Sequence, residues 1–170
     1  MDEAHTAGVK VAAHAIGDKA TRIAAEAGVD SIEHAYVVPD DVLKTMVDKH
    51  IFLVPTDGTL KTFVDMSFGT REPSDSERAE REKEYAPVVK QEQDRLRRAI
   101  KLGVLIAAGS DMYLSMPRMT RGQASLLVYE AYAEAGMTPM EKPTYTLPTD
   151  ASPAAATPLA MITSNPISSE

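Results

Sequence analysis

The sequence of 170 residues contains no cysteine. Disulfide bonds, a thiolate nucleophile and a cysteine-ligated zinc site are therefore excluded. No apolar run approaches the roughly 18 residues that a membrane-spanning helix needs, and the first residues lack the basic region and apolar core of a signal peptide. These absences predict a cytoplasmic location.

Positive charge is also in short supply. Lysine and arginine total 18 against 25 aspartates and glutamates, which gives a net charge of −7. This balance argues against nucleic acid or an anionic membrane surface as the main partner. With 44% hydrophobic residues, the chain can still bury a core, and its length suits one domain.

Three short apolar runs each end in a side chain that can bind a metal ion. They are residues 11–14, ending at His14, residues 31–34, ending at His34, and residues 104–111, ending at Asp111. Each run is rich in small or β-branched residues, as buried parallel strands are. A single histidine at a strand end is more often structural, but three ligands in register favour a site. Two imidazoles and a carboxylate could bind a divalent metal such as Zn²⁺.

Helical segments separate these runs. The hydrophobic spacing and the turn signals predict strands over residues 10–14, 29–34, 51–54 and 104–108, and helices over residues 1–8, 18–27, 39–47, 76–102 and 122–135. Residues 56–75 suit a long loop. This alternation predicts an α/β fold with parallel strands and right-handed crossovers.

Two segments differ from this pattern. The helix over residues 76–102 begins with a run of charges and becomes apolar only later, so we expect its first turns to project into solvent. The preceding loop should lie over the site. From about residue 142 the chain is rich in Pro, Ser and Thr, and we expect residues 142–170 to be disordered.

Several of these stretches resemble the metal-dependent amidohydrolase superfamily, in its imidazolonepropionase-like and Xaa-Pro dipeptidase-like branch. The resemblance is carried by His14 within residues 11–15, residues 27–34, the step at residues 54–56, residues 109–111, and residues 134–141, similar to that group's turn after the last barrel helix. Its most specific part is the run Gly-Val-Asp-Ser-Ile-Glu-His at residues 28–34. The resemblance covers residues 1–141.

The resemblance implies a partial (β/α)₈ TIM-type barrel, about strands 5–8 with their helices. It makes His14 the fifth-strand and His34 the sixth-strand ligand of one metal. Asp111 becomes the eighth-strand carboxylate, which ligates the other metal and takes the proton from the attacking water. Zn²⁺ is the expected metal, with Co²⁺, Mn²⁺ or Ni²⁺ as alternatives. The implied activity is hydrolysis of a carbon–nitrogen bond in a small amide, cyclic amide or dipeptide-like substrate.

The family's first-strand His-X-His pair and its fourth-strand carboxylated Lys or Glu have no counterpart here. His5 lies within a predicted helix and His50 follows the end of another, and neither replaces these ligands. A complete barrel takes about 250 residues, so the alternative is a truncated, catalytically inactive fragment. A third reading is an interaction subunit that completes its barrel with another chain. We expect the isolated chain to be nearly inactive and to self-associate through unpaired strand edges at residues 10–14 and 104–108.

Four further residues are candidates by position. Tyr36, Thr56 and Asp57 follow strands at the mouth of the predicted site. Arg118 lies in the loop after Asp111, where it could bind a substrate carboxylate. For Tyr36 and Arg118, a solvent-exposed side chain without a role is the alternative. Strand alternation predicts that Glu33 points away from His34, towards the helices.

Overall fold

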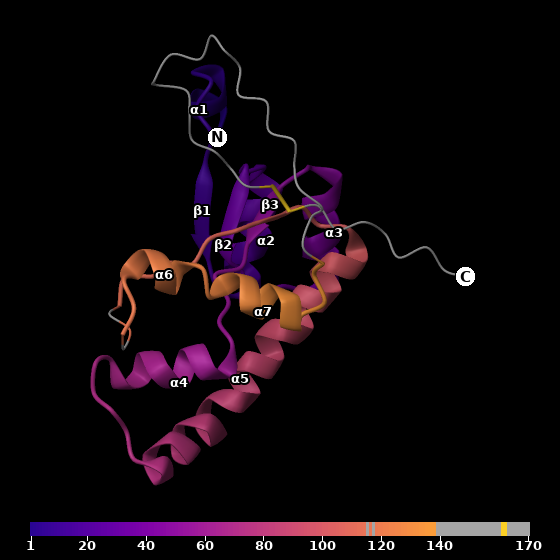
Figure 1. Ribbon diagram of the computed structural model, residues 1–170. Coiled ribbons are helices and arrows are strands. Elements are labelled where there is room, and N and C mark those ends of the chain that lie inside the picture. Colours follow the sequence, from indigo (N-terminus) through magenta and orange to yellow (C-terminus); the bar gives the residue numbers. More distant parts are fainter. Residues whose placement is uncertain (115, 117, 139–160, 163–170) are drawn as a thin grey trace.

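Four parallel strands form the sheet that carries the candidate ligands (Figure 1). In chain order they are β1 (Ala12–Ala15), β2 (Ser31–His34), β3 (Phe52–Val54) and β4 (Ile106–Ala107). They pair in this same order, which confirms the predicted parallel arrangement. The computed structural model describes residues 1–114, 116, 118–138 and 161–162, so most of the segment predicted to be disordered lies outside the described residues.

The prediction that both edges of the sheet are unpaired is wrong for the edge at β4. A two-residue strand, β5 (Met161–Ile162), pairs antiparallel with β4. An edge strand offers a row of backbone donors and acceptors, and a nearby extended segment can satisfy them. β1 is the terminal strand at the other edge of the described sheet.

Seven helices occur in the described part of the chain. They are α1 (Asp2–Thr6), α2 (Asp18–Ala27), α3 (Asp40–Asp48), α4 (Leu60–Phe68), α5 (Asp75–Leu102), α6 (Arg121–Ser125) and α7 (Val128–Glu134). The start of α5 is fixed by a capping box, in which Ser74 and Glu77 bond each other's backbone N–H groups. Its end is fixed by Gly103, whose φ of 83° suits a residue without a Cβ. None of the described helices is long and apolar enough to cross a membrane.

The loop expected over residues 56–75 contains a helix instead. α4 begins after Thr59, whose hydroxyl accepts the N–H of Thr62 and so caps the first turn. Val64 is fully buried, and Phe63 stacks on Tyr85 of α5 with ring centroids 5.8 Å apart. Packing against α5 therefore stabilises a helix that the mixed sequence pattern does not predict.

The single helix expected over residues 122–135 is divided in two. Between α6 and α7 the backbone hydrogen bonds shorten to the i to i−3 pattern, as in the bonds from Leu126 N–H to Gln123 O and from Leu127 N–H to Ala124 O. The tighter turn leaves Leu126 exposed while Ala124 and Val128 are both buried.

The main core lies between one face of the sheet and the helices. Its fully buried side chains include Ile32, Leu53 and Ile106 of the strands, Leu43 and Met46 of α3, and Leu96 of α5. The opposite face of the sheet is open. Strand residues of that face, among them Ser31, Phe52 and Val54, line a hollow of 560 Å³.

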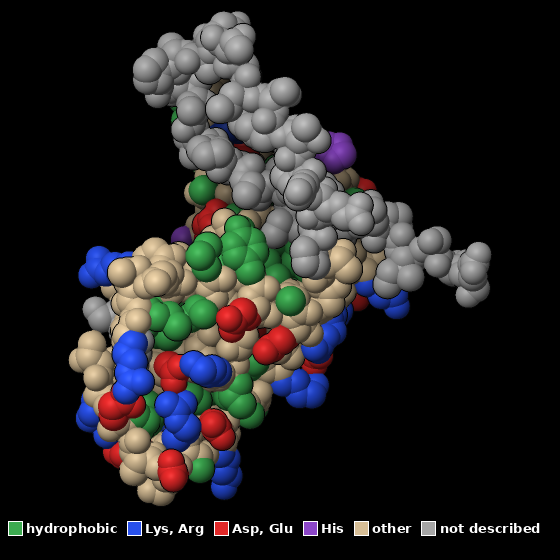
Figure 2. Space-filling model, in the orientation of Figure 1, with side chains coloured by type: hydrophobic (Ala, Val, Ile, Leu, Met, Phe, Trp, Pro, Cys, Tyr) green, Lys and Arg blue, Asp and Glu red, His purple; other side chains and the backbone are tan. Residues whose placement is uncertain are grey.

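The long helix behaves as its charge pattern predicts. Within residues 76–86 no side chain is buried, whereas Val89, Leu96 and Ala99 are. In Figure 1 the first turns of α5 run out beside α4, away from the sheet. Acidic and basic side chains gather over this part of the surface in Figure 2.

A close approach of β3 to the segment after β4 gives a stability test. A Cβ added at Gly109 would overlap Cγ1 of Val54. We expect Gly109→Ala to lower the free energy of unfolding by about 1–3 kcal/mol through overpacking. Adding Val54→Ala should recover part of that loss, as a double-mutant cycle in urea would show.

Gly122→Ala is the matched control, because a Cβ there meets open space and the residue lies in α6. It should be neutral or stabilise by up to about 1 kcal/mol. Equal losses for Gly109→Ala with and without the Val54 change would contradict the steric account.

Candidate functional site

The two predicted histidine ligands lie side by side at the carboxyl ends of β1 and β2. In the β1–β2 register, Ala15 lies opposite His34, and His14 lies opposite Glu33. The His14 and His34 rings meet edge to face, with centroids 4.6 Å apart. His14 is exposed, whereas His34 is only 8% exposed. Two adjacent strands therefore deliver both imidazoles to one point.

Asp111 lies beyond the end of β4, and its charge reaches His34. Burial lowers the pKa of His34, the nearby His14 lowers it further, and the Asp111 carboxylate opposes both. The net shift is downward, so His34 is neutral at physiological pH. A neutral imidazole keeps the lone pair that a metal ion requires.

A left-handed backbone conformation recurs where the strands end. The φ angles are 70° at His34, 55° at Thr56 and 47° at Asp111. Such angles cost non-glycine residues about 1–3 kcal/mol each and cluster at functional sites. They turn the chain sharply, so that the side chains after β2, β3 and β4 leave the regular strand alternation.

This turn explains why the prediction for Glu33 is wrong. Ile32 is fully buried in the core beneath the sheet, and Glu33 lines the hollow on the opposite, open face, where Ser31 donates a 2.7 Å hydrogen bond to it. Regular alternation would then send His34 to the helix side. The left-handed angle at His34 breaks the alternation. The direction of the Glu33 side chain therefore could not be inferred from that of His34.

Thr56 and Tyr36, both predicted to bind substrate, contact His34. Oγ1 of Thr56 lies 2.8 Å from Nδ1 of His34, and the Tyr36 hydroxyl lies 3.3 Å from the same nitrogen. The two hydroxyl oxygens are 3.1 Å apart. Burial raises the pKa of Tyr36, so its hydroxyl stays protonated.

A buried charge cluster lies behind these residues. Arg95 of α5 forms an ion pair with Asp57, and their side chains are 1% and 3% exposed. Glu92, also on α5, is buried nearby. Burial raises the pKa of Asp57 to about 6, although Arg95 opposes the shift. Burial and the Asp57 charge raise the pKa of Glu92 to about 8.

Sequence reasoning placed Asp57 near the site but missed Glu92 and Arg95. Both lie in the later, amphipathic part of α5, beyond the charge run that was predicted to be a solvated face. Their spacing of three residues from each other places them on one face, and Val89, Leu96 and Ala99 share the buried side. The signal was therefore present in the apolar neighbours of the two charged residues.

A pocket of 170 Å³ opens beside the strand ends. Its lining includes polar residues, namely Tyr36, Thr56, Asp57, Ser110 and Asp111. It also includes apolar residues, among them Phe63, Met66, Met112, Leu127 and Val128. Small-molecule sites have this mixture of a few convergent polar groups and an apolar lining.

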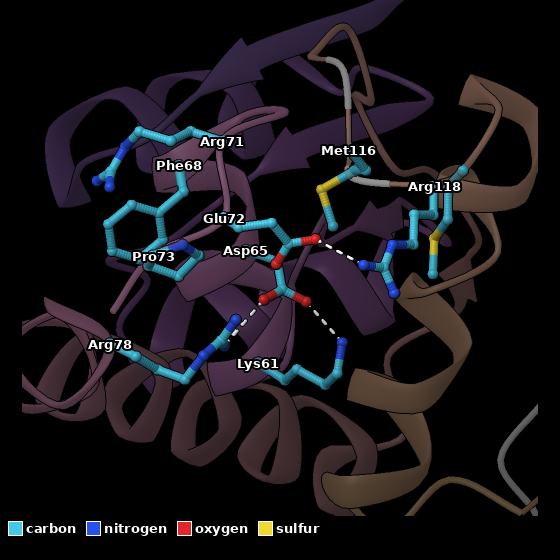
Figure 3. Close-up of a pocket in the computed structure, with 10 residues that line it drawn as sticks. Lys61, Asp65, Phe68, Arg71, Glu72, Pro73, Arg78, Met116 and Arg118 are labelled. Carbon is cyan, nitrogen blue, oxygen red and sulfur yellow. Dashed lines mark hydrogen bonds and ion pairs between the residues drawn. The ribbon is translucent and has the colours of Figure 1, made fainter. Parts of the chain in front are cut away.

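Arg118, the third predicted substrate contact, lies in a different hollow. Figure 3 shows it directed at Glu72, with which it forms a 2.9 Å ion pair. Asp65 in the same hollow pairs with Lys61 and Arg78. The structure therefore brings Tyr36 and Thr56 to the histidines but not Arg118.

The donor set fits part of a metal shell. In the residues that the structure describes, no group of three or more His, Cys, Asp or Glu side chains is close enough to hold a metal ion. The structure does bring His14 and His34 together, and Thr56 contacts Nδ1 of His34. Imidazole nitrogens are preferred ligands of Zn²⁺. A ligand role for Asp111 stays a prediction.

Comparison with known proteins identifies the class. The chain matches the Amidohydrolase family over residues 1–145, and it belongs to that family. A comparison with curated proteins gives no match.

Solved structures agree with this assignment. A Xaa-Pro dipeptidase with methionine bound in its active site is 28% identical, with a TM-score of 0.55 over 80% of this chain and 31% of that one. The A. niger ochratoxinase is 26% identical, with a TM-score of 0.57 over 81% of this chain and 29% of that one. A prolidase complexed with N-methylphosphonate-L-proline is 26% identical, with a TM-score of 0.55 over 79% of this chain and 30% of that one. The chain thus spans about a third of these proteins, and its four parallel strands match part of their barrel.

The Glu92 carboxyl predicts a pH dependence of stability. Its folded-state pKa of about 8 lies above its ordinary value, so between these values the folded state holds a proton that the unfolded state has lost. The free energy of unfolding should therefore fall as the pH rises towards about 8, with a slope of at most about 1.4 kcal/mol per pH unit from this group.

Glu92→Gln should flatten the profile, most clearly between about pH 6 and 8, above the pKa of Asp57. Urea unfolding across this range measures the slope. Glu82→Gln, at an exposed position of the same helix, is the control and should keep the wild-type slope. An unchanged slope in Glu92→Gln would contradict the assignment of this pH dependence to the Glu92 carboxyl.

Proposed function

We propose that this chain supplies part of the active site of a metal-dependent hydrolase that cleaves carbon–nitrogen bonds in small amide or dipeptide-like substrates. The observation that carries the proposal is the contact between His14 and His34 at the ends of adjacent parallel strands, in a chain of the Amidohydrolase family. The carboxyl ends of barrel strands are where such folds place their catalytic groups.

Each candidate residue has a role that its chemistry allows. When bound, a divalent metal such as Zn²⁺ would lower the pKa of a coordinated water and polarise the substrate carbonyl. His14 and His34 would hold the metal through neutral ring nitrogens. The Asp111 carboxylate would accept the proton from the attacking water and pass it to the leaving nitrogen.

The pocket beside the strand ends suits a small substrate with an apolar side chain. Its volume of 170 Å³ accommodates a group of amino-acid size. The hydroxyl of Tyr36 would hydrogen-bond the polar part of the substrate, while Phe63 and Leu127 would contact the apolar part. Arg118 would bind a substrate carboxylate only by exchanging its present partner, Glu72.

The second candidate is a fragment that is inactive alone. The chain covers 31% of the Xaa-Pro dipeptidase that it matches, and its sequence has no counterpart of the family's His-X-His pair or bridging Lys or Glu. Such a fragment would need the missing ligands from elsewhere. A second copy that pairs along β1 is one arrangement by which the sheet could extend.

Metal titration tests the proposed ligands. The wild-type chain should bind Co²⁺ weakly, with the d–d absorption of a nitrogen-ligated ion, and His14→Ala or His34→Ala should weaken binding by more than the 10–100-fold of an outer-shell change. Asp111→Asn should also weaken it, because a charged ligand is lost. His50→Ala, which removes an exposed histidine outside the site, is the control and should bind like wild type.

Hydrolysis of a panel of dipeptides, including Xaa-Pro, separates the two candidates. We expect no turnover from the isolated chain at the usual enzyme rates of about 1–10³ s⁻¹. Turnover that depends on Co²⁺ or Zn²⁺ and is lost in His34→Ala would reject the inactive fragment. Co²⁺ binding that is equal in wild type and in both histidine variants would reject the metal site itself.

A further inference from the structure

We propose that Thr56 is a positioning residue for His34, whose Nδ1–H donates to Oγ1 of Thr56 and so leaves the Nε2 lone pair free for a metal. This inference rests on the proposed function, because only a metal site requires that tautomer. It assigns Thr56 a role towards His34 instead of the substrate contact expected from its position after β3.

Thr56 is nearer to Nδ1 of His34 than Tyr36 is, at 2.8 Å against 3.3 Å. His34 is 8% exposed, and its Nδ1 lies 2.8 Å from Oγ1 of Thr56, so water does not compete freely for this nitrogen. His34 ends β2 and Thr56 follows β3, and these strands are paired neighbours. Metal-ligating histidines typically donate their second ring N–H to a fixed acceptor, which sets the tautomer and the ring orientation.

The direction of the hydrogen-bond chain determines whether Nε2 of His34 is free to bind a metal. If His34 donates to Thr56, the Thr56 hydroxyl can donate to the Tyr36 oxygen at 3.1 Å, and the Tyr36 proton remains for a ligand in the pocket that Tyr36 lines. If the chain runs the other way, Tyr36 donates to Thr56 and Thr56 donates to Nδ1. The proton of neutral His34 then lies on Nε2, and that nitrogen cannot bind a metal.

The backbone around Thr56 is held from both sides. A β-branched residue with a φ of 55° is an outlier that persists only where its surroundings fix it. Pro55 precedes it with a fixed φ, and Asp57 follows it, locked in the buried ion pair with Arg95. The ion pair therefore holds Thr56 in a conformation that it would not adopt freely.

Nitrogen-15 NMR of histidine-labelled full-length chain tests the tautomer directly, at about pH 8, where imidazole is neutral. The His34 signals are assigned by their loss in His34→Gln. We expect the wild-type pattern of a protonated Nδ1, its retention in Thr56→Ser, which keeps the hydroxyl, and its loss in Thr56→Val, which has nearly the same shape without it. A wild-type spectrum with the proton on Nε2 overturns the proposal whether or not any variant folds.

Co²⁺ affinity provides the second readout. Thr56→Val should weaken binding about 10–100-fold, the usual effect of removing an outer-shell partner, while Thr56→Ser stays near wild type. Equal weakening in both variants would refute the role of the hydroxyl. The two proposals can fail separately. If Nδ1 is protonated and this depends on Thr56, but Co²⁺ binding does not depend on His14 or His34, the hydrogen bond is supported and only the proposed function is rejected.

Discussion

The ion pair between Arg95 and Asp57 is the interaction on which the candidate site depends. It joins the longest helix to the end of β3, and both side chains are almost fully excluded from water. Removing one partner of such a pair leaves a buried charge uncompensated, which costs about 3–5 kcal/mol. Glu92, whose pKa is raised by the same burial, completes a cluster that ties the position of the strand end to the packing of α5.

From this fixed point the site is built out of strand ends that turn abruptly. His34, Thr56 and Asp111 all adopt left-handed backbone angles, each at or just beyond the end of a different strand. The strain is spread over three neighbouring loops, and the packing beneath the sheet supports it. The side chains consequently leave the sheet in directions that regular strands could not give them.

The two faces of the sheet have different roles. Ile32, Leu53 and Ile106 bind the sheet to its helices through a close-packed core. Ser31, Phe52 and Val54 line the hollow on the other face, where a closed barrel would be filled by side chains from the remaining strands. The membership of the Amidohydrolase family and the coverage of about a third of its solved members agree with this open face.

The sequence by itself determined the alternation of strands and helices, the parallel sheet and the positions of His14, His34 and Asp111 at strand ends, because hydrophobic spacing and helix caps are local signals. Only the tertiary structure decided that α4 forms, that the last predicted helix divides, and that Glu33 faces the open hollow. It also decided that Glu92 and Arg95 are buried. These outcomes depend on contacts between segments that are far apart in the sequence, so they cannot be predicted from the residues of one segment alone.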